Sequence, residues 1–223
     1  MTAGAARVVV IDDDPSVLTS LARLVRTAGY EVEALRSARE FLARPPTEVP
    51  TCLVLDVRLP GLTGLELQGL LTAAGGGPSI VFITGHPDVP ASVSAMKGGA
   101  VDYLTKPVRA RDLLDAIARA VAQSAHMRRE RAEAAELKSR IGTLTPREAE
   151  VFALVVTGLL NKQIAGQLGI GEKTVKVHRA QVMRKMNAAS LAELVQLASQ
   201  AGVLAARSPS LDQGAIPRST RIQ

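Results

Sequence analysis

This chain of 223 residues has little cysteine and no long apolar run, and each of these features excludes a class of protein. Cys52 is the only cysteine, so a disulfide within the chain is excluded and a reducing cytoplasm fits. No run reaches the roughly 18 apolar residues that a membrane-spanning helix needs. Residues 1–7 also lack the charged-then-apolar layout of a signal peptide. We therefore expect a cytoplasmic protein with no membrane partner.

Charge divides the chain into two parts. Residues 1–107 carry 9 Lys and Arg against 11 Asp and Glu, whereas residues 108–223 carry 18 against 10. A chain of this length has room for two domains of ordinary size. An acidic first half joined to a basic second half indicates two tasks, the second of them on a polyanion.

The stretch from Cys52 to Gly61 is the clearest signal in the first half. Its apolar run, Cys52 to Leu55, is typical of a strand buried on both faces of a parallel sheet. Asp56 ends that run, and Pro60-Gly61 then turns the chain into a loop. Asp56 is thus expected at the carboxyl end of a buried strand, where open α/β sheets bind ligands. Taken alone, this carboxylate could equally cap the next helix.

A strand followed by a helix recurs along the first half of the chain. The expected strands are Arg7–Ile11, Tyr30–Leu35, the Cys52 strand, Ser79–Thr84 and Val101–Thr105. Between them we expect helices, including Ala91–Lys97 and a short helix opened by the capping-box sequence Ser37–Glu40. This alternation predicts an α/β fold, a doubly wound parallel five-stranded sheet with helices on both faces.

Polar and charged side chains gather where four of these strands end. They are Asp12, Asp13, Asp56, Thr84 and Lys106. Right-handed crossovers place the carboxyl ends of the strands along one edge, so these side chains should share a crevice. Clustered carboxylates repel unless a cation neutralises them, and a few hard oxygen ligands suit Mg²⁺. One carboxylate could then accept a phosphoryl group, whose remaining oxygens Lys106 and Thr84 would bind.

Four segments of the first half resemble the receiver domain of two-component response regulators. They are Ile11–Asp14, Leu55–Gly61, Ile83–His86 and Tyr103–Pro107, and the run Gly85–Pro90 with Ala95–Tyr103 is similar to the FixJ type. The resemblance implies that Asp56 is the phosphoacceptor and that a sensor histidine kinase is the donor. It also implies that Asp12, Asp13, Asp56 and the backbone carbonyl of Arg58 hold Mg²⁺, Asp12 partly through water.

The same resemblance implies a conformational switch. Thr84 would move onto the phosphoryl group while Tyr103 turns inward. For Tyr103 the alternative stays open that an aromatic ring simply packs against the edge of the sheet.

Residues 123–140 contain neither glycine nor proline and are rich in Ala, Arg and Glu, which favours a helical linker. Thr145–Glu148 then has the features of a helix start, with an N-cap Thr followed by Pro. Two further helices, Asn161–Leu168 and Glu172–Asn187, are joined by Gly169-Ile170-Gly171. Two helices joined by a short turn containing Gly form the helix-turn-helix layout.

The segments Leu144–Glu148, Asn161–Ala165 and Lys173–Arg179 resemble the LuxR-type DNA-binding domain. The resemblance implies a four-helix domain whose last helix, here Ser190–Ser199, commonly dimerises. The family places residues of the second helix-turn-helix helix in the major groove, here Lys176, Val177 and Ala180. The whole implied DNA-contacting set is Lys162, Lys173, Thr174, Lys176, Val177, Arg179, Ala180, Arg184 and Lys185. Its other basic members are expected on phosphates, which carry affinity but little sequence information.

The expected organisation is a receiver at residues 6–122, a helical linker at 123–140, an all-α helix-turn-helix domain at 141–205 and a disordered tail at 206–223. The expected function is a phosphorylation-controlled transcription regulator that is not an enzyme. It would dimerise when phosphorylated and bind a two-fold-symmetric DNA site, with RNA polymerase as a candidate partner.

Two other classes stay open. One is a phospho-switch whose basic half docks on an acidic protein partner instead of DNA. The other is a hydrolase that works through an aspartyl phosphate. Such a hydrolase usually has a second Asp two residues after its nucleophile, and this chain has Arg58 there.

Overall fold

The computed structural model describes residues 6–203. The chain divides into two compact units, and the division falls between residues 130 and 131. The expected disordered tail, residues 206–223, lies outside the described residues. Within residues 6–203, no helix is both long and apolar enough to cross a membrane.

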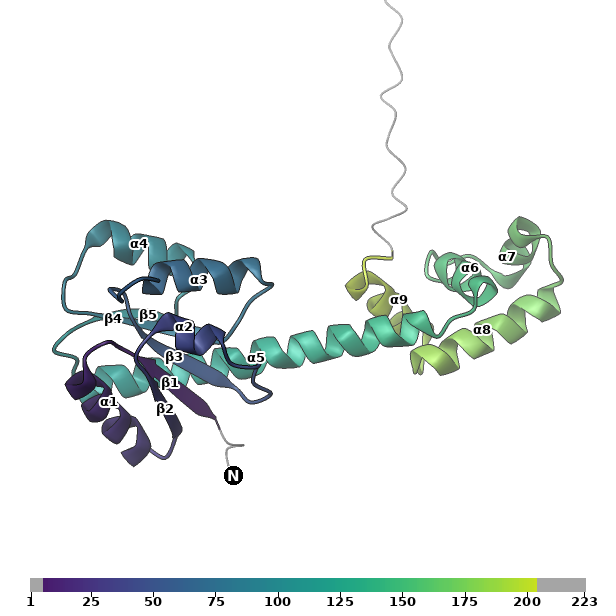
Figure 1. Cartoon of the computed structure of the whole chain (residues 1–223). Coiled ribbons are helices and arrows are strands. Elements are labelled where there is room, and N and C mark those ends of the chain that lie inside the picture. Colours follow the sequence, from purple (N-terminus) through teal and green to yellow (C-terminus); the bar gives the residue numbers. More distant parts are fainter. Residues whose placement is uncertain (1–5, 204–223) are drawn as a thin grey trace, which may run out of the picture. The chain divides into compact units, whose positions relative to one another are not determined.

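The first unit contains a parallel five-stranded sheet, as the alternating pattern predicts (Figure 1). Its strands are β1 (Arg7–Ile11), β2 (Glu31–Leu35), β3 (Thr51–Asp56), β4 (Ser79–Thr84) and β5 (Asp102–Thr105). Their order across the sheet is β2-β1-β3-β4-β5, so β3 is central. Every residue of β3 and β4 is buried, because helices cover both faces of the sheet.

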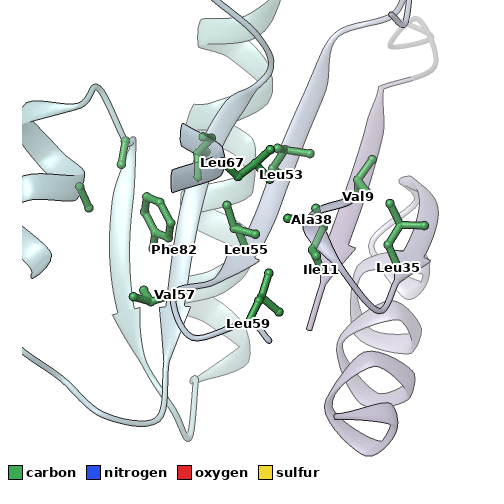
Figure 2. Packing of buried hydrophobic residues seen from close by; sticks show 13 residues of the cluster. Val9, Ile11, Leu35, Ala38, Leu53, Leu55, Val57, Leu59, Leu67 and Phe82 are labelled. Atoms are coloured by element: carbon green, nitrogen blue, oxygen red, sulfur yellow. The ribbon is translucent and has the colours of Figure 1, made fainter. Parts of the chain in front are cut away.

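Two hydrophobic cores lie on the two faces of this sheet. The helices of the first unit are α1 (Pro15–Thr27), α2 (Ala38–Leu42), α3 (Gly64–Ala73), α4 (Val89–Lys97) and the first part of α5 (Ala110–Gly142). Residues of α2, α3 and α4 pack on one face, where Leu55 and Phe82 are register partners on neighbouring strands beneath Leu67 (Figure 2). Residues of α1 and α5 pack on the other face. The doubly wound α/β prediction is confirmed.

Local capping signals begin several of these helices. Thr63 and Glu66 form a capping box at the start of α3, and the Asp14 carboxylate caps α1. The capping box predicted at Ser37–Glu40 is only half formed. The Ser37 hydroxyl accepts the Glu40 N–H, but the Glu40 carboxylate accepts the N–H of Arg36 rather than that of Ser37. Helix α4 begins at Val89, before the expected Ala91, since Pro90 is well suited to a first helical turn.

The predicted helical linker is part of one uninterrupted 33-residue helix, α5. Its middle belongs to the first unit. The Ser124 hydroxyl accepts the Thr51 N–H at 3.1 Å, and the Arg128 guanidinium donates to the Thr47 carbonyl at 2.8 Å. The compact first unit therefore runs on to Glu130, and the boundary expected at residue 122 stays a prediction. Leu137, nearer the end of α5, is buried in the core of the second unit.

Over its described residues, 131–203, the second unit holds four further helices, as expected for its all-α class. They are α6 (Pro146–Val155), α7 (Asn161–Leu168), α8 (Glu172–Met186) and α9 (Leu191–Gln200). Val175, Val182 and Met186 of α8 are fully buried, which confirms the apolar back of that helix. Asn187 ends α8 in the left-handed conformation that commonly closes a helix, with φ of 51°.

Candidate functional site

Strand register brings the predicted acidic residues together. Ile11 of β1 pairs with Leu55 of β3, so the residues that follow them, Asp12 and Asp56, are neighbours at the carboxyl edge of the sheet. Carboxylate oxygens of Asp12, Asp13 and Asp56 all lie within 4.8 Å of one another. Asp12 and Asp56 are buried, whereas Asp13 is exposed. The predicted cluster is therefore present.

Lys106 forms ion pairs with both buried members of this cluster. On the neighbouring strands Thr84 pairs with Thr105, which places Lys106 just past the end of β5. Its Nζ atom lies 2.6 Å from Asp12 Oδ2 and 2.5 Å from Asp56 Oδ2. Burial alone would lower the pKa of Lys106, but the hydrogen bonds to the two carboxylates outweigh it and raise that pKa. The ammonium therefore stays charged between the two carboxylates.

Burial acts in the opposite direction on Asp12. Desolvation raises the pKa of this carboxyl group, and the hydrogen bonds from Lys106 and from the Asp14 N–H offset only part of that rise. A second cation near Asp12 would favour its ionised form. The residues present thus fit Mg²⁺, because three clustered carboxylates share one ammonium and offer hard oxygen ligands.

Backbone groups fix the orientation of Asp56. Its Oδ1 accepts the Arg58 N–H at 3.0 Å, which leaves Oδ2 to Lys106. The start of α3 lies directly against the same residue. A Cβ on Gly64 would lie 2.3 Å from the Asp56 carbonyl oxygen, so only glycine permits this approach. The predicted role of the Arg58 carbonyl as a metal ligand stays a prediction.

The two predicted switch residues lie on β4 and β5. The Thr84 hydroxyl accepts the His86 N–H and donates to the His86 carbonyl, both at 3.2 Å, so the loop after β4 holds it. The Tyr103 ring lies 6.3 Å from the Phe82 ring, and its hydroxyl is buried without a hydrogen-bond partner in the described part of the chain. Movement of either residue on phosphorylation stays a prediction.

The predicted DNA-contacting side chains lie on α7 and α8. Seven of them are exposed: Lys162, Lys173, Thr174, Lys176, Val177, Ala180 and Arg184. Val177 is apolar and 59% exposed, on a helix whose opposite side is buried. Arg179 is half-buried and donates to the Asn161 side chain at 3.1 Å, linking α8 to the start of α7.

Lys185 differs from the rest of that set. Its ammonium lies 2.6 Å from Glu148 Oε2 and donates to the Thr143 carbonyl at 2.9 Å. This hydrogen bond from Lys185, with others from Thr145, lowers the pKa of Glu148 to about 2. Lys185 therefore packs α8 against the start of α6, and its predicted phosphate contact stays a prediction. In the sequence Glu148 is recognisable only as a helix-capping residue, so its ion pair with Lys185 was not predicted.

Two family profiles match the chain, one on each unit. Residues 8–118 match the response regulator receiver domain, and residues 142–198 match the luxR family of bacterial regulatory proteins. This chain belongs to the response regulators that join a receiver domain to a LuxR-type domain. It is accordingly a phosphorylation-controlled, DNA-binding transcription regulator, with a sensor kinase and DNA as partners.

Known regulators are similar to this chain over most of the length of both proteins. Nodulation protein W of Bradyrhizobium diazoefficiens is 50% identical over 200 residues, which cover 90% of this chain and 88% of that protein. The transcriptional regulatory protein FixJ of Azorhizobium caulinodans is 45% identical over 194 residues, covering 87% and 92% of the two chains. The solved structure of the response regulator StyR is similar with a TM-score of 0.80 and 48% identity, over 88% of this chain and 100% of that one.

Proposed function

We propose that Asp56 is the residue that accepts the phosphoryl group. The observation that carries this proposal is the position of its carboxylate at the carboxyl end of β3, oriented by the Arg58 N–H and held beside Lys106. A carboxylate oxygen of Asp56 attacks the phosphorus of a phosphohistidine on the kinase. The new P–O bond forms as the P–N bond breaks, and the departing histidine nitrogen takes up a proton from water.

The neighbouring side chains have separate roles in this transfer. Lys106 offsets negative charge on the phosphoryl oxygens, and the Thr84 hydroxyl donates a hydrogen bond to one of them after leaving His86. Asp12, Asp13, Asp56 and the Arg58 carbonyl would hold Mg²⁺, which supplies charge neutralisation at the transferring phosphoryl group when bound.

Phosphorylation is proposed to favour a receiver dimer and so pair two LuxR-type domains on a two-fold-symmetric DNA site. Exposed Lys176, Val177 and Ala180 would enter the major groove. Lys162, Lys173, Thr174 and Arg184 would contact the flanking backbone, and Arg179 would orient α8 through Asn161. RNA polymerase would then be recruited by the bound dimer.

Phosphorylation with a small-molecule donor tests the choice of Asp56. Acetyl phosphate and Mg²⁺ should produce a singly phosphorylated wild-type chain on a phosphate-affinity gel. Asp56→Asn should give no shifted band, whereas Asp88→Asn, a change at an exposed carboxylate outside the cluster, should behave as wild type. A shifted band that persists in Asp56→Asn would contradict the proposal.

A further inference from the structure

Helix α4 is held unevenly along its length. Val89 at its start is 75% exposed, and the N-cap residue Asp88 makes no side-chain capping hydrogen bond. Ala95 in its last turn is fully buried in the core above the sheet. Segments with few buried contacts and weakly satisfied ends open most readily. The N-terminal end of α4 is therefore the looser one.

A buried amide on α3 holds the other end. Gln68 is only 5% exposed, and its Nε2 donates to the Ala95 carbonyl at 2.9 Å. The same carbonyl accepts the Ala100 N–H at 3.1 Å, in the turn that closes the helix. A buried amide is costly unless it is hydrogen-bonded, so this bond favours a fixed position for Gln68.

Gly98 makes this close approach possible. A Cβ at this position would lie 2.7 Å from Cδ of Gln68, well inside the normal contact distance. The end of α4 thus presents bare backbone to the Gln68 amide. Any larger residue there would force the Gln68 amide to shift from its place against the end of α4.

Phosphorylation would act on the opposite, N-terminal end of α4. Thr84 is bonded through its hydroxyl to both backbone groups of His86, in the loop that leads from β4 to α4. If Thr84 turns to a phosphoryl group on Asp56, those bonds break and the loop is released. A helix released at its start and held at its end turns about the held end.

We propose that Gln68 is a positioning residue that provides the fixed pivot for α4 when Asp56 is phosphorylated. This rests on the proposed function of Asp56 and Thr84. Without the pivot, the end of α4 opens in the absence of a phosphoryl group, and the switch loses its directed motion.

Hydrogen–deuterium exchange on the full chain tests the pivot, with and without beryllofluoride and Mg²⁺. Gln68→Met keeps an unbranched side chain of similar volume but removes the donor, while Ala95 keeps its bond from Ala100. Thr72→Val is the matched control, because it removes a 2.9 Å bond from the Thr72 hydroxyl to the Gln68 carbonyl within α3. The control loses one hydrogen bond to a carbonyl without affecting α4.

In wild type, beryllofluoride should speed exchange over residues 85–92 and leave residues 95–100 unchanged. Gln68→Met should speed exchange of residues 95–100 about fivefold even without beryllofluoride, as the loss of one net hydrogen bond predicts. Thr72→Val should not change residues 95–100.

Three outcomes would overturn the pivot. One is a beryllofluoride response in wild type that is as large at residues 95–100 as at 85–92. Another is wild-type exchange at residues 95–100 in Gln68→Met, and the third is an equal rise in β1 and β3, which would mean general loss of stability. A wild type with no response anywhere over residues 85–92 would instead contradict the proposed function, and the pivot proposal would fail with it.

Discussion

Lys106 and Asp56 form an ion pair at the carboxyl edge of the sheet, with 2.5 Å between Nζ and Oδ2. The same ammonium binds Asp12, so two buried carboxylates share one lysine. This arrangement connects stability to function. The site concentrates negative charge to bind a cation and a phosphoryl group, so its carboxylates must be stabilised when neither is bound.

Removing the ammonium should destabilise the first unit and increase its response to Mg²⁺. Lys106→Met leaves Asp12 and Asp56 buried without a counter-charge, so we expect a loss of about 3 kcal/mol in Mg²⁺-free buffer. Thermal unfolding with and without Mg²⁺ measures this, and the cation should restore more stability to the variant than it adds to wild type. Lys97→Met, at an exposed lysine of α4, is the control. An equal stabilisation of Lys106→Met and wild type by Mg²⁺ would contradict the role of Lys106 as the counter-charge of Asp12 and Asp56.

Two glycines of α3 should respond oppositely to the same substitution. Gly64→Ala places a Cβ 2.3 Å from the Asp56 carbonyl oxygen, so we expect about 1–3 kcal/mol of destabilisation and slower phosphorylation. Gly69→Ala meets nothing within 4 Å and should stabilise the helix by roughly 0.5–1 kcal/mol. Chemical denaturation followed by circular dichroism compares them. Equal effects of the two substitutions on the free energy of unfolding would show that the start of α3 does not pack closely against the end of β3.

The ion pair between Glu148 and Lys185 makes the second unit sensitive to acid. The Glu148 pKa is lowered from its ordinary 4.5 to about 2 in the folded chain, so folding favours the ionised form. Its stabilisation is complete above pH 4.5 and is lost as the pH falls toward 2.

The free energy of unfolding of wild type should therefore exceed that of Glu148→Gln at pH 6, and the difference should shrink steadily below pH 4.5. Denaturation at a series of pH values gives this difference. The contributions of the other carboxylates largely cancel, because both proteins contain them. A difference that is constant from pH 6 to pH 2.5 would show that Glu148 is not held ionised by Lys185.

Salt dependence of DNA binding distinguishes Lys162 from Lys185. Lys162 is exposed, and Lys162→Ala should weaken binding to any sequence while reducing the slope of log K against log salt by about 0.9. Lys185→Met should destabilise the domain but leave the slope unchanged, because its ammonium is engaged by Glu148. Fluorescence anisotropy over a range of salt concentrations measures the slopes. If Lys185→Met reduced the slope as much as Lys162→Ala, the phosphate contact predicted from sequence would be correct.

Local patterns in the sequence predict much of this architecture. Apolar runs ending in turn residues mark β3 and β4. The carboxylates at the ends of β1 and β3 come together because parallel strands end at one edge of the sheet. The apolar back of α8 follows from residue spacing alone, since Val175, Val182 and Met186 recur at helical intervals. These features depend on neighbours in the chain or on a single topological rule.

Contacts between distant segments were not predictable in the same way. The pairings of Glu148 with Lys185 and of Gln68 with Ala95 depend on how helices pack, and nothing local in the sequence specifies that packing. The same holds for the anchoring of α5 on the first unit through the bond between Ser124 and Thr51. Even the capping box at Ser37 was half wrong, because the Glu40 side chain could reach a different N–H.

Light scattering of wild type and Asp56→Asn, each with and without beryllofluoride and Mg²⁺, tests the central claim most directly. We predict that only wild type with beryllofluoride and Mg²⁺ doubles in mass and that its DNA affinity rises in the same condition. A wild type that stays monomeric, with unchanged DNA affinity, would contradict control of this regulator through Asp56. So would an Asp56→Asn variant that still dimerises in response to beryllofluoride.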